Sequence, residues 1–201
     1  MSSDDPVGRY SRAMAHPRVE QLRFARSEFL RGLDGLSGEH AAQQPGPMNS
    51  IAWMVGHLAW HEQLSWLTRA QGVTPRPELN ELTANGKPRS NPPLAEMLAA
   101  WREVTAASDG WLDALEPANL ATPMGRSRIP QSVGTALLRM TYHYFVHCGE
   151  ASAVRQLIEG GQLPEFVGAI QVEAPWRSEP AWEAGAAGEA GDAEPGTEVV
   201  A

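Results

Sequence analysis

Apolar residues recur at helical spacing in several separate segments of the chain, and the first of these covers residues 17–34. Pro17 suits the first position of a helix, where its missing N–H costs nothing, and Gly35 is a residue type that often ends one. Charged side chains fall largely on other faces. The apolar stripe consists of Val19, Leu22, Ala25, Phe29 and Leu33. We therefore predict a helix over 17–34.

The second segment, residues 50–71, is apolar on nearly all sides, which is typical of a helix buried on several faces. Asn49 and Ser50 are both good N-cap residues for it. On a helical wheel His57 and His61 share one sector. That sector also contains Trp53, Met54, Leu64 and Thr68.

Two further helices are predicted in the second half of the chain. One begins with Asn91 as cap and Pro92 as first residue and continues to about Leu115, with Gly110 weakening its middle. The other covers about 131–160, with Ser132 as a candidate cap and Gly160 near its end. Both follow long connectors, 72–91 and 117–130. The sequence predicts an all-α fold, a four-helix bundle with long crossover connections.

Strand patterns are scarce, and the residues Val167, Ile170 and Val172 would add at most a short extended piece. We expect residues 1–15 to form a flexible arm, 16–170 the bundle, and 171–201 an acidic tail. From Val172 onward there are seven acidic residues and one arginine, so this segment carries −6 of the net charge of −8. Its composition offers little apolar area to offset the entropy of ordering, which predicts disorder. Trp176 and Trp182 are its candidates for weak packing on the bundle.

Several classes of protein are disfavoured by composition. There is no basic stripe of the kind that binds nucleic acid. There is also no apolar run of the roughly 18 residues that a membrane span needs, and no basic head with an apolar core that would indicate a secretory signal. The one cysteine, Cys148, fits a reducing compartment. We expect a cytoplasmic protein that binds neither nucleic acid nor membrane.

The most informative motif is a pair of histidines, His143 and His147, in the last predicted helix. Residues four apart lie on one helical face, about 5–6 Å apart, so both imidazoles can bind one metal ion. Glu150 falls on the same face. The apolar residues at matching positions are Ala136, Met140, Val154, Leu157 and Ile158. The histidines are therefore expected to face the core, where a metal would satisfy their nitrogens.

A third ligand is expected from the helix at 50–71. Three neutral imidazoles bind Zn²⁺ and leave a fourth position open, and nickel, cobalt and iron accept the same donors. We favour His57 over His61. His61 could instead hold a carboxylate that lies behind the metal ligands, contact substrate, or lie partly exposed near the bundle end. Glu150 could orient a ligand imidazole, act as a general base, or be a carboxylate at the surface edge. Cys148 points away from the histidine face.

At these residues the sequence resembles the DinB-like superfamily of four-helix metalloproteins. The matching pieces are 36–39 (LSGE), 45–58 (PGPMNSIAWMVGHL) and 143–150 (HYFVHCGE). The resemblance implies a metal-binding triad at His57, His143 and His147, a divalent ion that is usually zinc or nickel, and frequent homodimers. It also implies chemistry like that of thiol-dependent transferases and isomerases that use mycothiol, bacillithiol or glutathione. His61 and the acidic tail depart from the pattern of the family.

These observations favour a metal-dependent enzyme that acts on a small-molecule substrate. The leading interpretation is a low-molecular-weight-thiol-dependent S-transferase or isomerase, with Glu150 and His61 as candidate catalytic residues. One alternative is a metal-dependent hydrolase that uses metal-bound water. Another is a non-catalytic bundle that binds a ligand or a partner protein.

Overall fold

The computed structural model describes residues 15–127, 129–161, 165 and 167–176, and in this part of the chain the fold is all-α. Its long helices are α1 (Pro17–Arg31), α3 (Ile51–Glu62), α5 (Leu94–Asp113) and α7 (Val133–Glu159), and α3 continues as a π-helix, η2 (Gln63–Arg69). Short helices interrupt the connectors: α2 (Gly38–Ala41), α4 (Leu79–Leu82), α6 (Pro117–Leu120) and α8 (Ile170–Glu173). Within the described residues the β pairing consists of one isolated bridge between Pro123 and Ser132. The predicted fold class is confirmed.

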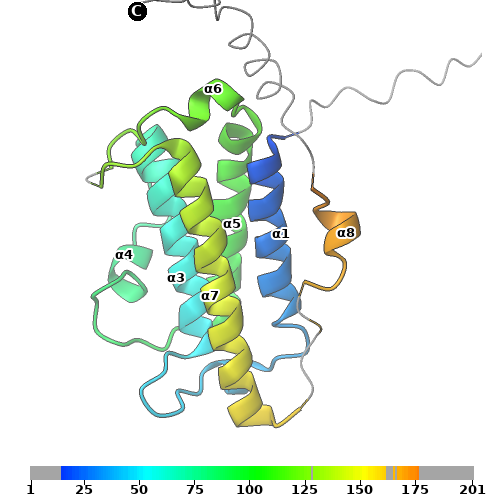
Figure 1. Ribbon diagram of the computed structural model, residues 1–201. Coiled ribbons are helices and arrows are strands. Elements are labelled where there is room, and N and C mark those ends of the chain that lie inside the picture. Colours follow the sequence, from blue (N-terminus) through cyan, green and yellow to red (C-terminus); the bar gives the residue numbers. More distant parts are fainter. Residues whose placement is uncertain (1–14, 128, 162–164, 166, 177–201) are drawn as a thin grey trace, which may run out of the picture.

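The four long helices form a bundle in which α3 packs most extensively on α5, and α1 on α7 (Figure 1). The chain runs down α1, up α3, up α5 and down α7, so α3 and α5 are parallel (Figure 1). The connector between them, which contains α4, therefore returns along the bundle. The other long connector, which contains α6, joins neighbouring ends of α5 and α7 and does not cross the bundle (Figure 1).

Several helix ends follow the predicted capping chemistry. Ser50 accepts a hydrogen bond from Trp53 N at the start of α3, and Ser132 accepts one from Thr135 N at the start of α7. Gly160 ends α7 in the left-handed conformation, with φ 67°. These caps satisfy backbone groups that have no partner within the helix.

Two predicted ends are wrong. Helix α1 ends at Arg31, with Gly32 as its cap, because the following residues form tighter turns before Gly35 takes a positive φ. Helix α5 begins at Leu94 rather than Pro92, and Asn91 does not cap it. The Asn91 side chain instead donates to the carbonyl of Ala42, which fastens the crossover to the connector after α1.

A buried polar network joins all four long helices. Arg26 of α1 makes a two-pronged ion pair with Glu62 of α3, at 2.8 and 2.7 Å. Tyr144 of α7 donates to Glu62 over 2.8 Å, and Trp101 of α5 donates its indole N–H to the Tyr144 hydroxyl over 2.8 Å. Every charged or polar atom in this chain of contacts has a partner, as burial requires. The network fixes the rotation of each helix, and so the face that α3 and α7 present to one another.

The segment after α7 differs from its prediction. Residues 170–173 form the helix α8, not an extended piece, because the carbonyls of Ala169 and Ile170 accept backbone hydrogen bonds of helical type. Ala174 is buried and its carbonyl accepts from Gln21, whereas Trp176 is 87% exposed and does not pack on the bundle. Trp182, the arm at 1–14 and most of the acidic tail lie outside the described residues. None of the described helices is long and apolar enough to cross a bilayer.

Candidate metal centre

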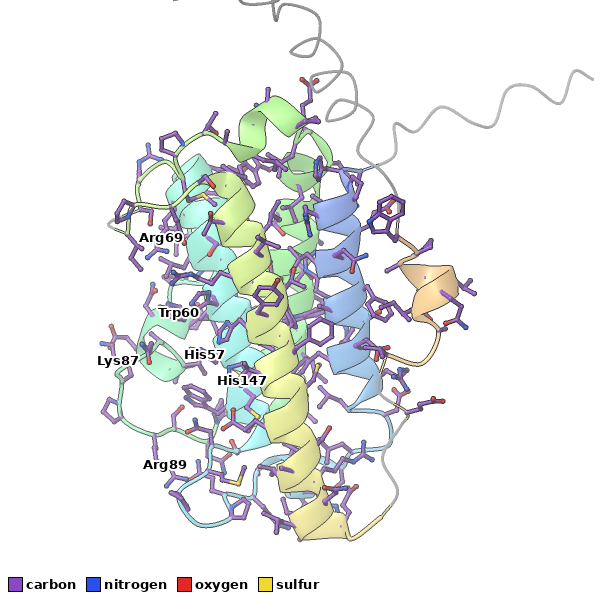
Figure 2. The ribbon with its side chains drawn as sticks, in the orientation of Figure 1. His57, Trp60, Arg69, Lys87, Arg89 and His147 are labelled. Carbon is purple, nitrogen blue, oxygen red and sulfur yellow. The ribbon has the colours of Figure 1, made fainter. Side chains whose placement is uncertain are left out.

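Three histidines from two helices converge inside the bundle. His57 comes from α3, and His143 and His147 come from successive turns of α7. One ring nitrogen from each histidine can be chosen so that all three lie within 4.8 Å of one another. Figure 2 shows His57 and His147 on facing sides of α3 and α7. The structure thus brings together the three residues that the sequence predicted as ligands.

The ring of His57 is held on both sides. Its Nδ1 lies 2.8 Å from the carbonyl oxygen of Thr83, which follows α4, so Nδ1 carries the proton and donates it. This leaves the lone pair on Nε2. Trp53, one turn earlier on α3, stacks on the ring with centroids 4.6 Å apart, and the Trp60 ring lies at 5.4 Å. The crossover connector is therefore part of the site, because it supplies the Thr83 carbonyl.

His147 is oriented in the same way by a carboxylate. Its Nδ1 lies 2.9 Å from Glu150 Oε2, which again places a proton on Nδ1 and the lone pair on Nε2. That Nε2 lies 3.0 Å from Nε2 of His143. A carboxylate that fixes the tautomer of an imidazole is the usual arrangement behind a metal-binding histidine. Of the three roles considered for Glu150, this contact matches that of orienting a ligand imidazole.

Burial keeps these imidazoles neutral. Burial lowers the pKa of His57, although the Thr83 carbonyl acts in the opposite direction. Burial, reinforced by the neighbouring histidines, lowers the pKa values of His61, His143 and His147 to about 3. At neutral pH the site therefore presents uncharged rings with free lone pairs, which is the form that binds a metal.

His61 lies beside the three-histidine group but outside it. Its ring is 4.5 Å from the ring of His143 and 5.9 Å from that of His57, centroid to centroid. Its Nδ1 is buried and has no hydrogen-bond partner among the described residues. His61 therefore lies next to the three-histidine group, and its Nδ1 is available to bind another molecule.

The structure also shows where Cys148 and Leu157 of α7 lie relative to the histidine group and the core. Cys148 is buried, is absent from the histidine group, and has a pKa raised by burial to about 12, so its thiol is protonated at neutral pH. Leu157, expected on the core face, is 68% exposed. The expectation for Leu157 was wrong because Leu157 lies on the same outer face of α7 as Val146, which is 64% exposed, whereas the next residue, Ile158, packs against the core.

The geometry fits a divalent metal ion. Two of the three imidazoles have Nδ1 bound to an acceptor, which leaves Nε2 as the donor. The two Nε2 atoms on α7 lie close enough to share one cation, and Nδ1 of His143 has no hydrogen-bond partner among the described residues that would turn its ring away. Three neutral nitrogen donors are the donor set of many catalytic zinc sites and suit related ions.

Sequence reasoning missed three contacts of His57 at this site. The carbonyl of Thr83 gives no signal in a side-chain pattern. Trp53 was placed in the same helical-wheel sector as His57, but the contact of its ring and of the Trp60 ring with His57 was not predicted. The spacing of three residues between His57 and Trp60 on one helix was the signal that could have placed Trp60 there.

The fold and the histidine cluster define a class of metal-binding helical bundle, and comparison with known proteins gives the family. The sequence profile of the DinB superfamily matches residues 21–151, and the chain belongs to this superfamily. Among solved structures, the chain is similar to one described as the crystal structure of the conserved protein of locus from Enterococcus faecalis. The two share 16% identity with a TM-score of 0.56, over 74% of this chain and 100% of the other, which shows a shared fold. No sequence among curated proteins matches.

Proposed function

We propose that this protein is a divalent-metal-dependent enzyme that transfers or isomerises substrates with the help of a low-molecular-weight thiol such as mycothiol. The observation that carries the proposal is the set of three neutral histidines with nitrogens within 4.8 Å of one another. A divalent ion held by His57, His143 and His147 would lower the pKa of a thiol or water at its open position. Zinc and nickel are the ions that we favour.

The residues of the chain have separate roles in this proposal. Glu150 and Thr83 fix the tautomers of His147 and His57, so that both rings present Nε2. His61, neutral and with an Nδ1 that has no hydrogen-bond partner among the described residues, lies where that nitrogen can hydrogen-bond an incoming thiol or substrate. Trp53 and Trp60 limit access of water to the His57 side. Glu150 is a positioning residue, since its carboxylate is occupied by His147.

The test uses cobalt in place of the native ion, because a thiolate that binds Co²⁺ produces a charge-transfer band in the near ultraviolet. The cobalt-loaded protein is titrated with 2-mercaptoethanol and with glutathione. We expect a saturable band, and Cys148→Ser should give the same band, since the chain has one cysteine and that thiol is buried. Full cobalt uptake without any effect of thiols would contradict thiol chemistry and favour a hydrolase. No cobalt uptake would favour a non-catalytic bundle.

A further inference from the structure

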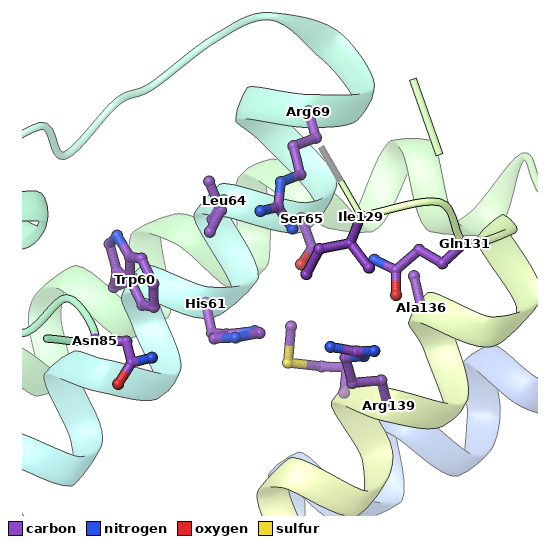
Figure 3. A pocket seen from close by; sticks show the side chains of 11 residues that line it. Trp60, His61, Leu64, Ser65, Arg69, Asn85, Ile129, Gln131, Ala136 and Arg139 are labelled. Carbon is purple, nitrogen blue, oxygen red and sulfur yellow. The ribbon is translucent and has the colours of Figure 1, made fainter. Parts of the chain in front are cut away.

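A cavity of about 240 Å³ lies next to the histidine cluster and is lined by His61 (Figure 3). It is bounded by the end of α3, by η2, by the first turns of α7 and by the connector before α7. The His61 ring points into it, and the same ring contacts His143. The cavity therefore begins one side chain away from the candidate metal centre. Its volume is below the roughly 300–1,000 Å³ of sites for drug-sized ligands, which indicates a small metabolite.

Two arginines line this cavity without an acidic partner. Arg69 is half-buried and Arg139 is exposed at the mouth. Five other described arginines are paired with carboxylates, namely Arg23, Arg26, Arg31, Arg76 and Arg155, whereas Arg89, Arg102 and Arg126 lie outside the cavity and form no such pair with a described residue. Among the described residues no carboxylate pairs with Arg69 or Arg139. Burial lowers the pKa of Arg69, and the positive charge of Arg139 lowers it further. An anion between two unpaired guanidinium groups would remove this repulsion.

Uncharged polar atoms at the cavity also have no partner. Nδ1 of His61 and Oε1 of Gln131 are both buried and accept no hydrogen bond from, nor donate one to, any residue that the structure describes, and both residues line the cavity. Buried polar atoms without a partner are rare in folded proteins and call for an explanation. A ligand with hydrogen-bonding groups would satisfy both. These atoms and the two arginines come from separate elements. The fold therefore brings the polar groups together at the cavity, and they do not form one stretch of sequence.

Arg69 is the last residue of the π-helix η2. A helix with i→i+5 hydrogen bonds turns less per residue than an α-helix, so it shifts the face that later residues occupy. An α-helical wheel puts Thr68 in the histidine sector, but Arg69 lines the cavity instead, and Thr68 bonds to the Val73 carbonyl. The backbone there is fixed, because Arg126 N donates to the Arg69 carbonyl. Gly125 allows this approach: a Cβ on it would lie 2.5 Å from the Arg69 oxygen.

We propose that this cavity binds the anionic end of a small metabolite, a carboxylate or a phosphate, between Arg69 and Arg139. The planar guanidinium fork binds either oxyanion through paired hydrogen bonds. Gln131 and His61 hydrogen-bond the body of the ligand and direct its other end toward His143 and His147. The identification of this metabolite as the substrate rests on the proposed function; the anion site itself stands on the cavity and its side chains.

The first experiment uses the metal-free full-length protein and isothermal titration calorimetry, with succinate, inorganic phosphate and the neutral diamide succinamide as probes. We expect at least one anion to bind ten-fold or more tightly than succinamide, and the stronger anion identifies the class. Arg69→Gln and Arg139→Gln should each weaken that anion about ten-fold. Arg102→Gln is the matched control, since Arg102 is exposed on α5 away from the cavity, and it should bind as wild type does. Equal binding of anions and amide, or equal loss in Arg102→Gln, would overturn the proposal.

The second experiment tests whether the anion site and the histidine cluster act on one ligand. The cobalt-loaded protein is titrated with 3-mercaptopropionate and with 3-mercapto-1-propanol, which differ in the carboxylate. The acid should bind at least ten-fold more tightly, and Arg139→Gln should remove that difference without weakening the alcohol. If both thiols bind equally, the inference is overturned while the proposed function stands. If cobalt is not taken up, the proposed function fails, and the metal-free titrations still decide the anion site.

Discussion

The histidines of this bundle are neutral because of where they lie, and this makes the stability of the metal-free protein depend on pH. In the unfolded chain an imidazole titrates near 6.5. In the folded protein burial, with the neighbouring rings, lowers the pKa values of His61, His143 and His147 to about 3. Between about pH 6.5 and 3 the unfolded state therefore binds more protons. The stability from these groups is complete above pH 6.5 and is lost as the pH falls.

We expect the free energy of unfolding of chelator-treated protein to be lower at pH 5.0 than at pH 7.5. The decrease should be at least that of one such imidazole, on the order of 2 kcal/mol. Urea unfolding at the two pH values measures it. Carboxylates such as Glu159, with a pKa lowered by Arg155, act in the same direction. Because it lacks one of these imidazoles, the variant His61→Asn should show a smaller decrease in the free energy of unfolding than wild type. Equal or greater stability at pH 5.0 would contradict the account.

The clustering of the three histidines was predictable from the sequence, whereas their surroundings were not. Helical spacing alone placed His143, His147 and Glu150 on one face, and a buried second helix pointed to His57. The Thr83 carbonyl came from a connector without periodicity. Arg139 lies one turn before His143, so the same spacing could have found it. Arg69 lies four residues after Ser65, which also lines the cavity, but the helical wheel placed Thr68 and not Arg69 in the histidine sector.

At the scale of elements, the close packing of α3 on α5 and on the crossover depends on Gly56. A Cβ at this position would lie 2.7 Å from Thr83 Cγ2 and would also collide with the Met97 side chain. A Cβ at Gly149, by contrast, would meet nothing within 4 Å, so no close helix approach explains that glycine. Gly56 is thus the glycine that sets the distance between His57 and the Thr83 carbonyl.

We expect Gly56→Ala to destabilise the protein by about 1–3 kcal/mol, the usual effect of overpacking a core. Gly110→Ala is the matched control in the middle of α5, where the side chain would meet nothing within 4 Å and the residue is exposed. Removing that glycine should stabilise the helix by about 0.5–1 kcal/mol. Urea unfolding of both variants gives the comparison. Gly56→Ala at least as stable as wild type would show that the contact is not tight.

Helix existence was easier to predict than helix ends or connectors. The apolar stripes gave four long helices, because burial of one face dominates their stability. The ends of α1 and α5 moved by two or three residues, where turns and tertiary hydrogen bonds such as Asn91 to Ala42 competed with helical capping. The four-residue helices were too short to produce a periodic signal.

At the scale of the whole molecule, the bundle holds two polar centres with different purposes. The network of Arg26, Glu62, Trp101 and Tyr144 is fully hydrogen-bonded and ties the four long helices together. In the described part of the chain, the histidine cluster and its cavity retain buried polar atoms without a hydrogen-bond partner at His61, His143 and Gln131. A satisfied network rigidifies a core, while unsatisfied atoms beside a cavity indicate a ligand. This contrast, within one small bundle, supports assigning function to the histidine end.

The central claim is that His57, His143 and His147 hold one divalent ion. Elemental analysis of wild type and of four single alanine variants, with melting measured with and without chelator, tests it most directly. We expect near-stoichiometric metal in wild type and in His61→Ala. His57→Ala, His143→Ala and His147→Ala should each lose most of the metal and the melting-temperature increase that bound metal gives by mass action. Full metal content in His57→Ala with loss in His61→Ala would move the third ligand, and retention in both α7 variants would contradict the site.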